Sequence, residues 1–130
     1  MRERQTDLVI IGAGPAGLAA AIAAASAGVA EIFLLDRLEE PGGILQQCIH
    51  NGFGVRYFQQ ELSGPEYAER FIAQLDLYPQ IHLKTESMVR KISSDHKVYT
   101  SGNDGLCCYQ AKAIILAMGC RERSRGVINI

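Results

Sequence analysis

The spacing of apolar residues changes along the chain and predicts its elements in order. Residues 7–11 are a short, β-branched apolar run, which is typical of a strand buried on both faces. Residues 15–27 are rich in Ala and Leu and predict a helix that Gly28 ends. Residues 31–35 form a second apolar run, closed by Asp36. We therefore expect a strand–helix–strand unit with parallel strands and a right-handed crossover.

The next part of the chain predicts a loop and then a second helix. Residues 37–58 have no helical or strand periodicity and are expected to be a loop. Ser63 and Glu66 form the sequence of a capping box, and Pro65 fits the first turn of a helix that ends before Pro79. The apolar stripe of this helix consists of Tyr67, Phe71, Ile72 and Leu75.

The last part of the chain combines two kinds of strand. Residues 81–85 predict a third parallel strand, after which the apolar period falls to two. The expected strands of an antiparallel meander are residues 88–93, 97–101 and 106–111. Residues 113–117 are wholly apolar again and predict a separate, buried parallel strand closed by Gly119. The fold class is therefore α/β, with a Rossmann-like parallel sheet and a three-stranded antiparallel β-meander.

Composition narrows the classes of function. The 130 residues suffice for one domain, and a net charge of -1 excludes a basic surface for nucleic acid. The four cysteines lack zinc-site spacing, so we expect reduced thiols in a cytoplasmic protein and no metal. Residues 8–30 carry no charge and could be a signal peptide or membrane span. We reject both, because Gly and Pro interrupt the run and its second half is mostly Ala.

The glycine-rich turn at residues 12–17 has the spacing of a dinucleotide-binding loop. Gly12 is expected to make the tight turn, Gly14 to let the backbone approach a pyrophosphate, and Gly17 to let helix and strand pack. The helix N-terminus adds partial positive charge. Asp36 follows Gly17 by about 20 positions, as expected of the acid that binds the ribose hydroxyls. Its carboxylate also disfavours a 2′-phosphate.

These motifs carry a family resemblance over the whole chain. The run GAGPAG, followed by Asp36 and Gly42-Gly43, resembles the FAD domain of the glutathione-reductase-like flavoproteins, the pyridine nucleotide-disulfide oxidoreductase superfamily. The run AKAIILAMG is similar to that family's second fingerprint, which ends in Ala-Thr-Gly, but Met118 replaces the Thr. The stretches GGILQQCIHNGFG and GCRER are most similar to one subgroup. It contains the flavoprotein encoded with anaerobic glycerol-3-phosphate dehydrogenase, and subunits of opine oxidase, sarcosine oxidase and cyanide synthase.

The resemblance implies FAD as cofactor and a set of contacts to it. Asp36 would bind the AMP ribose, and Arg37 is either an adenine contact or a solvated surface charge. Val89 would meet adenine through its backbone, and Asn51 would reach toward the flavin. Residues along the ribityl or AMP portion would be Gly43 and Ile44. The pyrophosphate would lie against Gly12, Ala13, Gly14, Pro15, Ala16 and Gly17, with Ala117 and Gly119 passing close by.

The sequence offers no convincing catalytic residue. Disulfide reductases of the family carry a CxxxxC pair after the two glycines, whereas this chain has Cys48 alone with His50 nearby. A redox disulfide is therefore not expected, although a lone thiolate adduct stays open. Cys120 is expected in a loop, and His82 and His96 are interpreted as ordinary residues without a partner acid or cysteine.

The resemblance also implies that the chain is the first segment of a longer flavoprotein. The nicotinamide-binding domain, with any NAD(P) site, and the closing FAD segment would follow it. We expect the flavin to supply the redox chemistry. The alternatives are a stand-alone ADP or dinucleotide-binding module without turnover, and an NAD-dependent Rossmann dehydrogenase, which the meander disfavours. An uncovered apolar sheet surface predicts self-association or cover by a missing C-terminal segment.

Overall fold

A computed structural model describes residues 1–47, 52, 54, 58 and 62–119 of the chain. It contains a six-stranded sheet in the order β3-β2-β1-β6-β5-β4. The strands are β1 (Arg2–Ile11), β2 (Ile32–Leu35), β3 (Ile81–Lys84), β4 (Ser87–Ile92), β5 (Lys97–Gly102) and β6 (Gly105–Leu116). The helices are α1 (Pro15–Ser26), α2 (Gly64–Leu75) and a short 3₁₀ helix, η1 (Gly43–Gln47).

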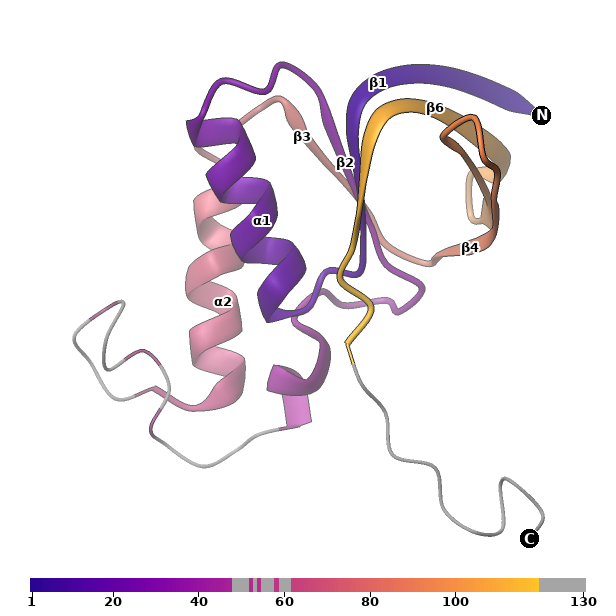
Figure 1. Cartoon of the computed structure of the whole chain (residues 1–130). Helices are drawn as coiled ribbons and strands as arrows, with labels where there is room; N and C mark the ends of the chain where they lie inside the picture. The colour runs from indigo at the N-terminus through magenta and orange to yellow at the C-terminus, as the bar shows by residue number, and fades with distance from the viewer. Residues whose placement is uncertain (48–51, 53, 55–57, 59–61, 120–130) are drawn as a thin grey trace, which may run out of the picture.

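The central strand β1 separates two hydrophobic cores. It pairs in parallel with β2 on one side and with β6 on the other. Leu8 and Ile10 pack on the helical side, together with Leu18 of α1 and Phe71 of α2. Val9 and the other alternate positions pack on the opposite side, against β5 and β6. Both helices therefore cover one face of the sheet, and the meander curls over the other face (Figure 1).

The predicted fold class is confirmed, but the last two predicted strands are one. Residues 106–111 and 113–117 were expected to be separate, whereas β6 runs without a break from Gly105 to Leu116. Its first half pairs antiparallel with β5, and most of its length pairs in parallel with β1. No Gly, Pro or other turn residue stands at Ala111–Lys112 to end the strand. The same long pairing starts β1 at Arg2, five residues earlier than expected.

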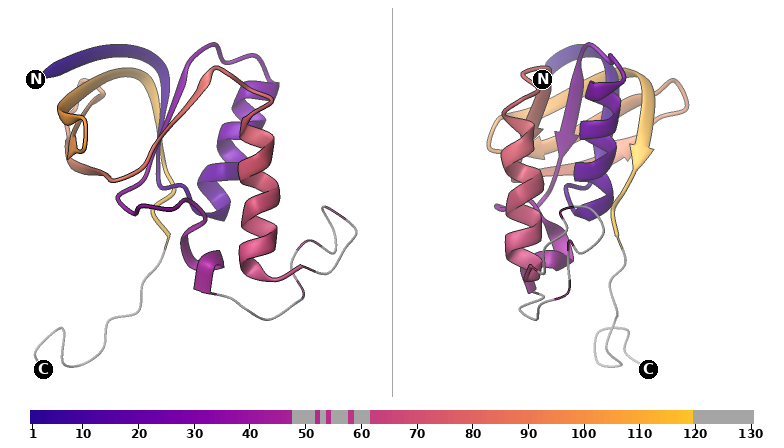
Figure 2. Two further views of the ribbon diagram at one scale, coloured as in Figure 1. Left: turned by 180° about the vertical axis from the view of Figure 1, so that it is seen from behind. Right: turned by 90° about the vertical axis from the view of Figure 1, so that its left-hand side faces the viewer.

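The second half of β6 is also less buried than its sequence predicts. Ile115 is 36% exposed and Leu116 is 58% exposed, although the apolar run predicted a buried strand. The two helices lie side by side on the sheet, and β6 lies beyond α1 at the margin of this layer (Figure 2). The prediction was wrong because burial of this end depends on a covering element, which the described residues do not provide.

The second helix matches its predicted signals closely. The Ser63 Oγ accepts a hydrogen bond from the Glu66 N–H at 3.3 Å, and the Glu66 carboxylate accepts one from the Ser63 N–H at 3.0 Å. These two bonds are the reciprocal pair of a capping box. Phe71 is buried, and the rest of the predicted apolar stripe packs against the same core. No helix among the described residues is long and apolar enough to cross a membrane.

Candidate nucleotide-binding site

The glycine turn is held against the end of β6. Gly12 has φ +109°, and a Cβ there would lie 2.1 Å from the backbone oxygen of Ala117. The Ala117 N–H donates to the Ile11 oxygen at 2.8 Å, which fixes this approach. The Gly12 N–H donates to the Leu35 oxygen at 2.7 Å. The turn therefore leaves β1 between its two parallel neighbours, at the carboxyl edge of the sheet where α/β folds bind ligands.

The other two glycines of the turn serve different purposes. A Cβ on Gly17 would lie 1.7 Å from the Gly12 oxygen, so the tightest constraint on Gly17 is inside the turn. Its contact with the sheet, the packing role expected from the sequence, is a looser 3.5 Å from the Leu34 side chain. A Cβ on Gly14 would meet nothing closer than the Gly43 Cα at 3.8 Å. The side-chain position of Gly14 therefore faces the Gly43 backbone at an ordinary van der Waals distance.

The N-terminus of α1 begins directly at Gly14. Gly14 is the N-cap residue, and no side chain caps this end of the helix. Pro15 occupies the first turn without an N–H, and that turn contains no acidic residue. The N–H groups of Ala16 and Gly17 belong to the first turn, where an α-helix provides no intrahelical acceptor. This arrangement suits an anion such as a phosphate.

Asp36 connects the glycine turn to the end of β2. Its Oδ2 accepts a hydrogen bond from the Ala13 N–H at 2.8 Å, and its Oδ1 accepts one from the Leu38 N–H at 2.8 Å. Sequence reasoning missed this anchoring, because it depends on a turn 23 residues away along the chain. A carboxylate has about four acceptor positions, so two remain for hydroxyl donors. Asp36 can therefore position the turn and still bind a diol.

The loop after β2 packs onto the glycine turn. The Gly42 N–H donates to the Ala13 oxygen at 2.6 Å. A Cβ on Gly43 would lie 3.0 Å from the Gly14 Cα, so the two backbones touch. Ile44 is exposed and does not line the cavity described below. Of the two residues predicted along the AMP or ribityl portion, the structure brings only Gly43 to the turn.

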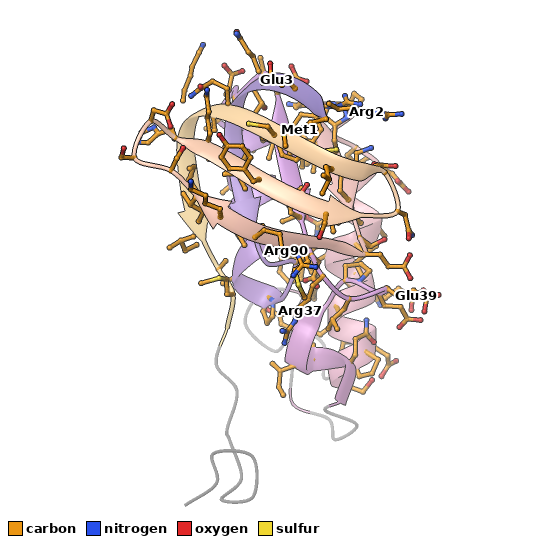
Figure 3. All side chains as sticks on the ribbon, turned by 90° about the vertical axis from the view of Figure 1, so that its right-hand side faces the viewer. Met1, Arg2, Glu3, Arg37, Glu39 and Arg90 are labelled. Atoms are coloured by element: carbon orange, nitrogen blue, oxygen red, sulfur yellow. The ribbon has the colours of Figure 1, made fainter. Side chains whose placement is uncertain are left out.

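A cavity of about 350 Å³ opens beside Asp36. The Ser87 N–H donates to the backbone carbonyl oxygen of Asp36 at 2.8 Å, which places the start of β4 next to the end of β2. The lining residues are Ile11, Gly12, Leu35, Asp36, Arg37, Ser87, Met88, Val89 and Met118. The structure thus brings four predicted site residues together around one cavity: Gly12, Asp36, Arg37 and Val89. Figure 3 shows Arg37 at the end of the sheet opposite Met1.

The remaining predicted residues lie near the cavity or outside the described part of the chain. Ala117 touches Gly12, and Gly119 follows with φ +73° and has open space where a Cβ would stand. Ser87, Met88 and Met118 line the cavity but were not predicted. The sequence held one signal for Met118, because this residue stands where the family's fingerprint has Thr. The predictions for Cys48, His50, Asn51 and Cys120 lie outside the described residues.

The described histidines and cysteines, which are His82, His96, Cys107 and Cys108, do not line the cavity. His82 stacks on Phe33 with ring centroids 4.7 Å apart, and its Nε2 lies 3.8 Å from the Glu31 carboxylate. The expectation that His82 has no partner acid was therefore wrong. Cys107 and Cys108 are free and buried. In the described ranges no group of three His, Cys, Asp or Glu side chains is arranged to hold a metal ion.

Comparisons with known proteins agree with this geometry. Residues 6–129 match the sequence profile of the family described as Pyridine nucleotide-disulphide oxidoreductase. The chain is 36% identical over 121 residues to a thioredoxin reductase from Aquifex aeolicus. It is 31% identical over 132 residues to an opine oxidase subunit from Agrobacterium tumefaciens. Its fold is similar to the crystal structure of L-proline dehydrogenase from P. horikoshii, with a TM-score of 0.80 at 21% identity.

The chain corresponds to a minor part of each of these proteins. The matches to the thioredoxin reductase, the opine oxidase and the proline dehydrogenase cover 91%, 90% and 95% of this chain. They cover 35% of the thioredoxin reductase, 24% of the proline dehydrogenase chain and 24% of the opine oxidase subunit. The similarity therefore extends over the dinucleotide-binding architecture described above.

Proposed function

The chain belongs to the Pyridine nucleotide-disulphide oxidoreductase family, and on that premise we propose that it is the N-terminal FAD-binding segment of a flavin-dependent oxidoreductase. One observation supports this most strongly. The uncapped N-terminus of α1 opens beside the cavity that Asp36 lines. A dinucleotide needs these two features together, because its pyrophosphate and its ribose are neighbouring groups.

The residues present fit the adenosine diphosphate half of FAD. The pyrophosphate would lie against the backbone from Gly12 to Gly17, where no side chain caps the first N–H groups of α1. The two ribose hydroxyls would donate to the free acceptor positions of Asp36. Val89 and Arg37 would contact the adenine, and Gly43, Ile44, Ala117 and Gly119 would flank the rest of the cofactor. When bound, the flavin supplies the redox chemistry, and this chain's own residues bind and orient it.

The same site also supports a second function, binding of ADP or a dinucleotide without turnover. The titratable side chains that line the cavity are Asp36 and Arg37, and this function uses both for nucleotide binding. An NAD-dependent Rossmann dehydrogenase is disfavoured, because after β3 the chain forms the meander instead of a further helix and parallel strand. Binding of the flavin half of FAD would favour the oxidoreductase segment, and binding of the ADP half alone would favour the module without turnover.

The motifs suggest a narrower group within the family. The stretches at residues 42–54 and 119–123 support the subgroup that contains the opine oxidase, sarcosine oxidase and cyanide synthase subunits. The single Cys48 agrees with a flavoprotein that does not reduce disulfides. The substrate would then be a small amine, a hydroxy acid or a glycerol phosphate, or the protein would relay electrons between subunits. Bleaching of the flavin in the longer protein by one of these substrates tests the assignment, and bleaching by a dithiol alone contradicts it.

The exposed end of β6 suggests what the chain contacts. Ile115 and Leu116 present apolar surface at the margin of the sheet, which favours self-association or cover by a further segment. We expect light scattering to give a mass above that of a monomer at high protein concentration. A monomer at every concentration contradicts self-association. A cytoplasmic location stays part of the proposal, and cell fractionation tests it.

A titration of the purified chain with FAD, ADP and NAD tests the proposed function. We expect the visible bands of oxidised flavin to shift on binding, and ADP to compete. Uptake of ADP without any FAD supports the binding module, and binding of NAD in preference to both contradicts the proposal.

Two matched variants assign the ribose contact. In Asp36→Asn the side chain loses its charge and an acceptor oxygen, so we expect ADP affinity to fall about tenfold. Glu39→Gln removes the same charge from an exposed position that does not line the cavity. Its affinity should change by less than about twofold, because exposed charges are screened. Equal losses in calorimetric titrations of the two variants would show that Asp36 acts only through its charge.

A further inference from the structure

The cavity beside Asp36 is lined by two methionines whose side chains the fold itself does not need. Met88 comes from β4, and Met118 follows the end of β6. They are 37% and 67% exposed, and neither belongs to the two buried hydrophobic clusters. Large apolar side chains at the wall of a cavity gain most when an apolar partner fills that cavity.

The position of these side chains relative to the polar residues suggests what that partner is. Asp36 supplies acceptors for a diol at one part of the wall, and Met88 and Met118 supply thioethers elsewhere on it. A nucleoside combines these two requirements, because it joins a ribose to a flat aromatic base. The methionine thioether is polarisable and flexible, and it makes favourable contacts with aromatic rings.

We propose that the side chains of Met88 and Met118 close on the adenine base of the bound nucleotide. This inference rests on the proposed function, and it adds two residues that set the affinity and position of the base. The base would replace water against both thioethers, while the ribose stays at Asp36. Loss of either apolar side chain would weaken ADP binding without changing the stability of the free protein, because neither packs in the core.

Methionine oxidation measures how far a bound nucleotide covers the two thioether sulfurs. The chain has three methionines, and the third, Met1, is 73% exposed. Met1 lies at the opposite end of the sheet from Arg37 (Figure 3), so it is an internal control. Hydrogen peroxide transfers one oxygen atom to a thioether sulfur and leaves as water. Peptide mass spectrometry then gives the rate of sulfoxide formation at each position, with and without ADP.

We expect saturating ADP to slow oxidation of Met88 and Met118 several-fold and to leave Met1 unchanged. FMN, which has no adenine, should protect neither residue. If calorimetry shows that ADP binds but Met88 and Met118 oxidise at the free rate, this proposal is wrong and the proposed function stands. Protection by FMN in place of ADP overturns it too. If ADP, FAD and FMN all fail to bind, the proposed function fails together with it.

Substitutions separate contact from simple access. Met88→Leu and Met118→Leu keep the apolar volume, so ADP affinity should stay within about threefold of the original chain. Met118→Gln has a similar length but a polar end, and should weaken ADP binding about threefold to tenfold. Leu77→Gln, at a position that is 73% exposed and does not line the cavity, is the matched control and should change nothing. An unchanged affinity in both Met88→Gln and Met118→Gln would contradict the proposal.

Discussion

The two helices on the sheet have the same length but opposite beginnings. Both α1 and α2 contain 12 residues, both carry a Pro in the first turn, and both pack on the same face. The first turn of α2 is closed by Ser63 and Glu66, whose side chains bond the free N–H groups. The first turn of α1 has no side-chain cap and no acidic residue.

The difference lies in the first backbone N–H groups, which side chains bond at the start of α2 and which stay available to a ligand at the start of α1. A capping box stabilises a helix by satisfying its first donors. An uncapped N-terminus leaves donors and partial positive charge for another group. Both helices connect parallel strands, so both N-termini point to the carboxyl side of the sheet (Figure 1). The uncapped end of α1 follows the glycine turn at the cavity, whereas Ser63 at the capped end does not line that cavity.

The largest expected effect comes from the glycine turn that opens α1. Gly12→Ala would place a Cβ 2.1 Å from the Ala117 oxygen at φ +109°. We expect a loss of about 3 kcal/mol or more in the free energy of unfolding, a large part of a typical domain's stability. Gly28→Ala, at the other end of α1, has a similar φ of +100° but nothing within 4 Å. Its loss should be about 1–2 kcal/mol from backbone strain alone.

Urea unfolding followed by circular dichroism measures both losses. Equal losses in Gly12→Ala and Gly28→Ala would show that the close approach of Ala117 contributes nothing.

The next largest effect should follow from giving α1 the acid that α2 has. Ala16 is exposed in the first turn, and Ala19 is exposed at the following turn. Ala16→Glu should raise helix stability by about 0.3–1 kcal/mol through the helix dipole. The same charge should lower ADP affinity at least about tenfold, because it repels the pyrophosphate. Ala19→Glu should change affinity much less, and calorimetric titrations that rank the two variants the other way would contradict the site.

The converse change in α2 should alter stability alone. Ser63→Ala removes one half of the capping box and should lower the free energy of unfolding by about 1 kcal/mol. ADP affinity should stay unchanged, because Ser63 does not line the cavity. Thermal unfolding and calorimetry of this variant give both quantities. A parallel loss of affinity would mean that the two helix ends are not independent.

The smallest effect is the part of the pH dependence that arises at the start of α2. The hydrogen bonds from Ser63 hold the pKa of Glu66 below its usual value. Between the folded-state and unfolded-state pKa values of Glu66, the unfolded chain therefore binds more protons than the folded chain. The stability from Glu66 is fully present above pH ~4.5, the ordinary pKa of its carboxyl group. It is lost as the pH falls through the folded-state pKa.

Glu66→Gln should reduce the slope of urea midpoints between neutral and acid pH, and Asp7 and Asp95, whose pKa values are also lowered, should account for part of the remainder. A slope as steep as that of the unsubstituted chain would assign the acid sensitivity to other groups.

Much of this architecture is encoded locally, and the sequence predicts those parts well. The capping box at Ser63 and the apolar run of β2 depend on neighbouring residues, and both appear as expected. The length of β6 could not be predicted, because its continuity comes from pairing with β1 about a hundred residues away. For the same reason the sequence did not show that Asp36 bonds Ala13, or that Met88 and Met118 line one cavity.

We propose that α1 binds a nucleotide pyrophosphate through its first backbone N–H groups, whereas at the start of α2 the side chains of Ser63 and Glu66 bond the corresponding groups. A ¹H–¹⁵N NMR titration of the chain with ADP tests it residue by residue. We predict large shifts for the amide signals of Gly14, Ala16 and Gly17 and unchanged signals for Ser63 and Glu66. Binding of ADP that leaves the three glycine-turn signals unmoved would contradict the account.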